Sequence, residues 1–194
     1  MMRRRFRAVA LLMALVAAGV ASASFAQAGP DVTANIGRTA AILGEPNEGG
    51  FSIWLSALWP FEQYLSFGPS LFADDLGTKA ERLTDPNDHT DLGAVAGLHR
   101  ITYGGAWRLD AEWPTRGAWA PYASGTWGLC HVADDLLGET VDTWNSTGFS
   151  LGVGLRYLFH GATVGTSVRY HRLFNDQVGR YVGISLDGSW HLGK

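Results

Sequence analysis

Three charged residues fall within segments that otherwise contain apolar and small residues. Arg156, Arg169 and Asp187 occupy small-residue positions of three successive alternating segments. Side chains of a strand alternate between its two faces, so these charges would project from one side of a sheet. A charged constriction of a pore and a buried charge network filling a lumen both fit this pattern. Buried charges need partners and narrow barrels are filled by side chains, so we favour the structural network.

Other reactive residues do not form a site by spacing. The acidic segment 85–91 offers oxygen ligands for calcium but lacks the glycine and terminal glutamate of an EF-hand loop, and a solvated loop explains it better. Cys130 is the only cysteine, which excludes an internal disulfide, and we expect a small packed residue. We predict no catalytic, cofactor-binding or metal site.

Three C-terminal segments alternate apolar with small or polar residues at period two. They are Phe149–Phe159, Ala162–His171 and Tyr181–Leu192. Each has about 11 residues, the length with which a tilted strand crosses a bilayer. Five earlier segments alternate less regularly, and Arg38 falls on the apolar face of the first: 33–44, 51–59, 65–71, 92–103 and 119–132.

These eight segments predict an all-β fold, a closed antiparallel up-and-down transmembrane β-barrel of about eight strands. Closure removes sheet edges, whose unpaired backbone groups could not be satisfied in hydrocarbon. The polar positions carry Gly, Ser and Thr instead of the Lys and Glu of a soluble surface, as in a narrow barrel interior. Aromatic residues near the segment ends suit interfacial girdles: Trp54, Trp59, Phe61, Tyr64, Trp119, Tyr122, Tyr157, Phe159 and Trp190.

The connections alternate in length along the chain. Residues 60–64 and 159–162 read as short turns, whereas 74–90 and 133–146 read as long acidic loops. Outer-membrane barrels have short periplasmic turns and longer extracellular loops. The link 104–117 reads as too long for a periplasmic turn.

The first 28 residues predict a signal peptide. Arg3, Arg4, Arg5 and Arg7 form a basic region, and an apolar run of about 13 residues follows, too short for a membrane-spanning helix. We place cleavage after Ala28, with Ala23 and Ala26 as alternatives, so residues 1–28 are the signal peptide and 29–194 the barrel domain. Cleavage lowers Lys plus Arg from 15 to 11 against 18 Asp plus Glu, a net charge of about −7. Such an acidic chain has no electrostatic basis for nucleic-acid binding.

Four short motifs resemble strands of small outer-membrane barrels of the OmpA-transmembrane-like and opacity-protein-like group. They are Pro121-Tyr122 with Gly125 and Gly128, Gly152-Val-Gly154-Leu-Arg156-Tyr157, Val168-Arg169-Tyr170, and the closing run 185–192. The resemblance implies the outer membrane as location and insertion by the barrel assembly machinery. It also suggests comparison with the lipid A 3-O-deacylase, whose His and Ser lie close together on one strand. Here Leu173 stands two residues after His171, so the nucleophile is missing.

Three function classes follow. The first is a structural or surface-interaction barrel with acidic extracellular loops, the second a narrow pore or small-solute transporter, and the third a lipid A-modifying hydrolase using His171, Asn175, Asp176, Ser185 or His191. A soluble periplasmic sandwich or lipocalin-like barrel is a further alternative. We favour the first, with outer-membrane lipids and lipopolysaccharide as partners, no cofactor, and a monomeric state.

Overall fold

The computed structural model describes residues 29–42, 49–84, 91–113, 115–136, 139–159, 161–174 and 180–192. They form eight strands, β1 (Asp31–Ile42), β2 (Gly50–Glu62), β3 (Leu65–Thr84), β4 (Asp91–Glu112), β5 (Trp119–Leu136), β6 (Glu139–Phe159), β7 (Ala162–Leu173) and β8 (Arg180–His191). No helix among the described residues is long and apolar enough to cross a membrane. The predicted signal peptide lies outside the described residues.

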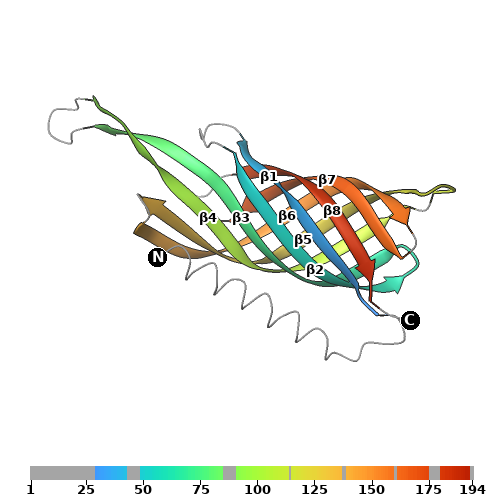
Figure 1. Cartoon of the computed structure of the whole chain (residues 1–194). Helices are drawn as coiled ribbons and strands as arrows, with labels where there is room; N and C mark the ends of the chain where they lie inside the picture. Colours follow the sequence, from blue (N-terminus) through green and yellow to red (C-terminus); the bar gives the residue numbers. More distant parts are fainter. Residues whose placement is uncertain are drawn as a thin grey trace.

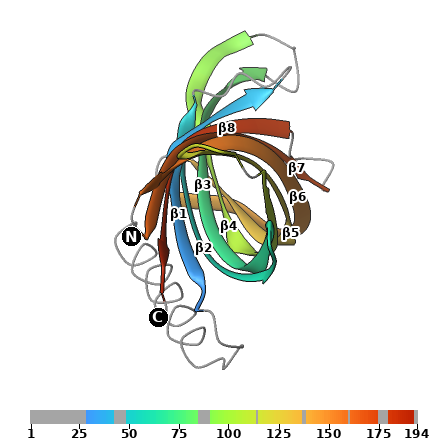
Figure 2. The same cartoon turned by 90° about the vertical axis from the view of Figure 1, so that its right-hand side faces the viewer.

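The strands form one closed barrel in chain order, with antiparallel neighbours throughout (Figures 1 and 2). The sheet closes where β1 pairs with β8, in unbroken register from Asp31 opposite His191 to Ile42 opposite Arg180. The predicted fold class is confirmed. Pro69 lies inside β3 opposite Trp107, and Arg38 lies on the outward face of β1 between Phe51 and Ile184.

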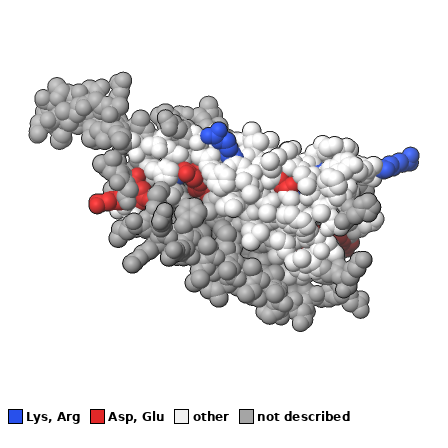
Figure 3. All heavy atoms as spheres, in the orientation of Figure 1, with Lys and Arg blue, Asp and Glu red and all other residues white. Residues whose placement is uncertain are grey.

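Alternation separates an apolar exterior from a polar interior. On β6, Leu151, Val153 and Leu155 are 59%, 64% and 40% exposed. Ser150, the residue before Leu151 on the same strand, faces the other way and is 2% exposed. The visible flank of the barrel is almost free of charge (Figure 3). A soluble sheet buries its apolar face, so this inverted arrangement fits a barrel surrounded by hydrocarbon.

Two of the predicted girdle residues point inward. Trp54 is 4% exposed and Tyr122 1%, because each follows the polar, inward parity of its strand. The other members that lie near the turn end of the barrel face outward, among them Trp119, Phe159 and Trp190, at 53%, 56% and 52%. Aromatic content alone therefore did not distinguish the girdle from the core.

The two segments predicted as long acidic loops are mostly strand. β3 runs to Thr84 and β4 starts at Asp91, whereas β2 stops pairing with β3 at Asp74 and β5 starts pairing with β4 at His99. Residues 75–84 and 91–98 therefore form a two-stranded projection, and we call the segment 75–98 the β3–β4 finger (Figure 1). Residues 139–147 of β6 likewise pair only with β5, and we call 136–147 the β5–β6 finger.

The predicted long link at 104–117 is also corrected. β4 continues to Glu112 and β5 begins at Trp119, so the connection is short, as expected at the end of the barrel that carries the other tight turns. The glycine pair Gly104 and Gly105 lies within β4, opposite Cys130 and Leu129, and does not mark a turn.

Candidate functional site in the barrel interior

One half of the interior, toward the tight turns, is closed by an ion-pair network on β4 and β6. Nε and Nη2 of Arg108 donate to the two carboxylate oxygens of Asp110 at 2.6 and 2.8 Å. Arg156 donates to Asp110 at 2.7 Å and to Glu112. Arg108, Asp110 and Arg156 are 0%, 0% and 3% exposed. These three ion pairs give each charged group of the layer an oppositely charged partner, whereas Nε of Arg156 donates no hydrogen bond. The guanidinium of Arg156 also lies 3.7 Å from the ring centre of Tyr122.

Asp187 on β8 forms the second part of this layer. Its carboxylate accepts hydrogen bonds from Asn35 and Tyr122, and from Ser167 and Ser185 at 3.1 Å each. All four donors are uncharged. Asn35 also accepts from Arg108 at 2.9 Å, so it links Asp187 to the ion pairs. Polar contacts therefore extend across the lumen from β8 through β1 to β4.

The three residues predicted as a lumen charge network all lie inside the barrel, each 3% exposed. The structure does not pair them with one another in the hydrogen bonds of the described residues. Arg156 contacts Asp110 and Glu112, Asp187 takes uncharged donors, and Arg169 lies over the ring of Trp54 at 4.8 Å. Nε and Nη2 of Arg169 have no hydrogen-bond partner.

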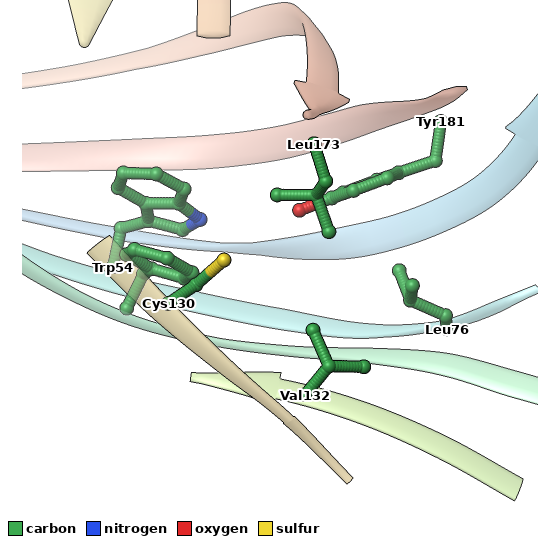
Figure 4. Packing of buried hydrophobic residues seen from close by; sticks show 7 residues of the cluster. Trp54, Leu76, Cys130, Val132, Leu173 and Tyr181 are labelled. Atoms are coloured by element: carbon green, nitrogen blue, oxygen red, sulfur yellow. The ribbon is translucent and has the colours of Figure 1, made fainter. Parts of the chain in front are cut away.

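The other half of the interior is closed by a mainly apolar cluster, formed by Trp54, Phe72, Leu76, Cys130, Val132, Leu173 and Tyr181. Their side chains converge from five strands, β2, β3, β5, β7 and β8 (Figure 4). Trp54 and Phe72 stack at 4.5 Å. A buried carboxylate, Asp74, accepts from Ser52 at 2.5 Å, Trp54 at 3.0 Å and Tyr181 at 2.7 Å. The apolar packing and this hydrogen-bonded carboxylate fill this half of the described interior with buried side chains.

A small cavity borders the apolar cluster. Its volume is about 20 Å³, and its lining includes Trp54, Thr126, Cys130, His171 and Tyr181. One water needs at least about 10–15 Å³ by the same measure, so the space suits a single small molecule. Cys130 is buried, and its thiol donates to the carbonyl of Ser146 at 3.4 Å. No group of three or more potential metal ligands occurs among the described residues.

The residues considered for hydrolysis are dispersed. His171 is stacked on Tyr181 at 4.3 Å inside the barrel, Ser185 donates to Asp187, and His191 pairs with Asp31 at the turn end at 2.9 Å. Asn175 and Asp176 lie outside the described residues, as does most of the proposed calcium segment 85–91. The described geometry therefore assembles no Ser–His–carboxylate triad from this set.

The sequence missed the carboxylates that complete the interior. Asp110 and Glu112 fall in the segment 104–117 and Asp74 in 74–90, and both segments read as connections instead of strands. The spacing of Arg108 and Asp110 was a usable signal, because residues i and i+2 of a strand share one face. The partners of these interior residues on β1, β6 and β8 depend on the register between strands, which a single sequence does not specify.

The sequence matches no protein-family model and no curated protein sequence. Solved structures share the fold. Neisserial surface protein A is 16% identical over 84% of this chain and 96% of its own, with a TM-score of 0.57. The N-terminal β-barrel domain of Pseudomonas aeruginosa OprF is 11% identical over 86% and 100%, with a TM-score of 0.53. OprG of the same organism is 11% identical over 87% and 98%, also at 0.53.

The fold and the outward apolar surface define the chain as a small eight-stranded β-barrel of the outer-membrane class. The similarity to the Neisserial protein, OprF and OprG confirms the fold that the strand motifs predicted. At these identities the similarity establishes architecture, so the particular role of this barrel has to be argued from its own residues.

Proposed function

We propose that this protein is a non-conducting outer-membrane barrel that displays two acidic fingers at the cell surface for interaction with cationic partners. The observation that carries this proposal is the double closure of the lumen. The ion-pair layer around Asp110 and the apolar cluster around Val132 lie one above the other, and Asp110 and Val132 are both 0% exposed. A barrel without an aqueous path acts through its surfaces.

The fingers supply such a surface. Ten residues of β3 extend beyond the last pairing with β2, a reach of about 30 Å at roughly 3.3 Å per residue. Segments 75–98 and 136–147 together carry seven Asp or Glu against Lys79 and Arg82. Some acidic side chains are visible at the left-hand end of the barrel, and others lie along its flank and toward the opposite end (Figure 3). Opposite charge on a partner raises its encounter rate and fixes its orientation.

Placing the fingers outside the cell follows from the loop pattern of the class, in which the short turns face the periplasm. The described turns 63–64 and the link 113–118 belong to the opposite end. This orientation puts the outward aromatic residues of the turn end at the periplasmic interface. Outer-membrane lipids and lipopolysaccharide then surround the barrel, the assembly machinery inserts it, and we expect it to remain a monomer.

Two measurements test the proposal. In planar bilayers the refolded protein should give no single-channel steps, whereas well-resolved steps would support the narrow-pore alternative and overturn the closed lumen. Proteoliposomes should bind a fluorescent basic peptide, and binding should fall as salt rises because the contacts are exposed charges.

The matched variant replaces Glu139 and Asp142, the exposed acids of the β5–β6 finger, by the corresponding amides. Peptide binding should drop severalfold in this variant. The folded barrel should still migrate differently on a detergent gel before and after boiling, and this heat-dependent gel shift reports that the variant is folded. Equal binding by the variant and the wild type would reject the role of the fingers. An altered lipid A mass spectrum on overexpression would instead support the hydrolase alternative.

A further inference from the structure

The outward face of the barrel carries three arginines at the finger end, on the neighbouring strands β7, β8 and β1. Arg172 and Arg180 are both exposed and stand opposite each other as the last pair of the β7–β8 register. Arg38 is also exposed, one pair from the end of the β1–β2 register. Like charges opposite each other on neighbouring strands repel. An anion placed between Arg172 and Arg180 therefore removes a repulsion that is built into the sheet.

The height of these arginines on the barrel matches the surface of a membrane. On β8, Arg180 and Trp190 both face outward and are ten residues apart. Ten residues span about 33 Å along a strand, and about 25 Å along the axis of a barrel whose strands tilt by about 40°. That is the height of the outward apolar band of an outer-membrane barrel. With Trp190 in the girdle at the turn end, Arg180 lies at the opposite surface of the membrane.

Aromatic side chains beside Arg172 support the same placement. The guanidinium of Arg172 lies 6.0 Å from the ring centre of Phe174, which is 56% exposed. The ring centre of Phe149 lies 5.6 Å from that of Phe174 and 6.3 Å from that of Tyr170. Aromatic rings gather at the level of the lipid headgroups. Arg172 therefore lies in the zone of the headgroup phosphates, next to rings that suit the upper part of the acyl chains.

Arg38 stands out because its outward neighbours are apolar. Phe51 and Ile184 lie opposite it on the two adjacent strands and are 51% and 63% exposed. A charge facing hydrocarbon costs free energy, and a long arginine side chain lowers that cost by extending toward the headgroups. The outward carboxylate of Asp75 on β3 is two strands away and pairs with His99 at 3.5 Å. An anionic lipid headgroup is thus a suitable counter-charge for Arg38.

The spacing of the three arginines suits a headgroup with two phosphates. Arg38 stands opposite Ile184, which is four residues from Arg180 and thus about 13 Å from it along the surface. Guanidinium groups bind phosphate oxygens through paired, charge-assisted hydrogen bonds. Lipid A, the membrane anchor of the lipopolysaccharide that forms the outer leaflet, carries one phosphate at each end of a disaccharide. The pair of arginines and the single arginine therefore match its two phosphates.

We propose that Arg172 and Arg180 bind one phosphate of a lipid A headgroup and Arg38 the other, which holds one lipopolysaccharide molecule against β7, β8 and β1. The inference rests on the orientation given under the proposed function, in which the finger end faces the outer leaflet. It does not depend on the closed lumen or on the acidic residues of the fingers. Because the contacts run from arginine to phosphate, binding needs no bridging divalent cation.

The first test titrates fluorescent lipid A into the refolded barrel in zwitterionic detergent micelles with a chelator present. Binding should saturate at one lipid A per barrel. Lipid A without its phosphates should bind at least about tenfold more weakly, since each basic residue near an anionic lipid contributes about fivefold. Equal affinity for the two forms would overturn the proposal. Equal competition by phosphatidylglycerol at the same negative charge would mean a general anionic surface and would also reject the lipid A site.

Matched variants separate the site from general charge effects. Arg172→Gln and Arg180→Gln should each weaken binding about fivefold, and the double variant roughly 25-fold. Arg116→Gln is the control, because Arg116 is exposed in the link at the turn end of the barrel and should not contribute. Arg180→Lys keeps the charge but loses the paired geometry, so its affinity should fall between those of the wild type and Arg180→Gln. No loss in the double variant, or an equal loss in Arg116→Gln, would reject the site.

Stability gives a readout that does not use the labelled lipid. In phosphatidylcholine vesicles, Arg180→Gln should leave the midpoint of the heat-dependent gel shift unchanged or raise it, because a like-charge pair is removed. In vesicles that also contain lipid A, the same variant should have a lower midpoint than the wild type, since the ligand stabilises the folded state that binds it. A lower midpoint in both kinds of vesicle would indicate a purely structural role and would overturn the proposal.

The orientation is tested separately, with an antibody raised against residues 85–90 of the β3–β4 finger. Labelling of intact cells is expected if the finger end faces outward. Labelling together with absent lipid A binding would reject the arginine site alone. Absent labelling of intact cells, with labelling after the outer membrane is permeabilised, would reject both the orientation and the assignment of the ligand to the outer leaflet.

Discussion

Arg108 and Asp110 lie two residues apart on β4, and their side chains meet inside the barrel through two hydrogen bonds of 2.6 and 2.8 Å. Because Arg156 reaches the same carboxylate from β6, one acidic residue holds two strands and two guanidinium groups together. Asp110 is therefore the centre of the polar layer. Ser124, the residue opposite it on the neighbouring strand β5, does not hydrogen-bond to it.

Replacing Asp110 by Asn should destabilise the barrel strongly. The change leaves Arg108 and part of Arg156 buried without their countercharge, a loss of about 3–5 kcal/mol for a broken buried pair. Urea unfolding followed by tryptophan fluorescence measures it. Asp31→Asn is the control, since Asp31 and His191 form an exposed pair with 41% side-chain exposure each, and such pairs contribute at most about 1 kcal/mol. Equal effects would contradict the role of Asp110.

The outward face of β6 should tolerate charge only near its end. Leu151 lies in the middle of the strand and Phe159 at its last position, and both side chains point outward. Leu151→Arg should cost about 2–4 kcal/mol in a bilayer and Phe159→Arg about 0–1 kcal/mol, because the penalty depends on depth. Folding into lipid vesicles at graded urea concentrations gives both values. A larger cost at Phe159 would mean that the bilayer is placed wrongly along the barrel.

Gly154 should not accept a side chain. An added Cβ would lie 2.4 Å from Cε1 of Tyr122 and 2.6 Å from the carbonyl oxygen of Thr166. Tyr122 cannot easily move, because it is bonded to Asp187 and covered by Arg156. Gly154→Ala should therefore cost at least about 1–3 kcal/mol from overpacking.

Gly125→Ala is the matched control for this position, since its Cβ would meet only the side chain of Leu151 at 3.8 Å. The fraction of each variant that keeps the heat-dependent gel shift reports the outcome. If both alanine variants refold equally well, the interior around Tyr122 is looser than its contacts indicate.

Trp54 should matter more than an outward tryptophan. It stacks on Phe72, donates to Asp74 and covers Arg169, so Trp54→Ala opens a cavity and should cost about 3–5 kcal/mol. Trp127 is 67% exposed and faces outward, and Trp127→Ala should cost less than half as much. Chemical unfolding followed by far-ultraviolet circular dichroism compares the two. A larger loss at Trp127 would argue against inward packing of Trp54.

The sequence predicted the number of strands and the outward face of β6, β7 and β8 because two different solvents impose a clear alternation. It failed where that contrast weakens. The acidic segments around Glu81 and Asp142 read as loops, yet a hairpin outside the membrane needs only backbone pairing and tolerates polar side chains on both faces. Trp54 and Tyr122 were assigned to the girdle because an aromatic ring fits either an interface or a packed core.

The interior partners depend on a different kind of information. Arg156, Arg169 and Asp187 could be placed on the inner face from parity alone. Their contacts with Asp110, Trp54 and Asn35 join strands far apart in the chain, and these contacts follow from the register and the curvature of the closed sheet. A single sequence contains the alternation of each strand but not the relative shift of its neighbours.

The pairing of β1 with β8 joins residues as far apart as Asp31 and His191, which are separated by 160 positions. No partial chain can satisfy the backbone of its first strand from both sides, so the native state has no stable intermediate made from the N-terminal strands alone. Synthesis must therefore finish before the ring can shut. The last strand to be made is a precondition for the first to acquire its final neighbours.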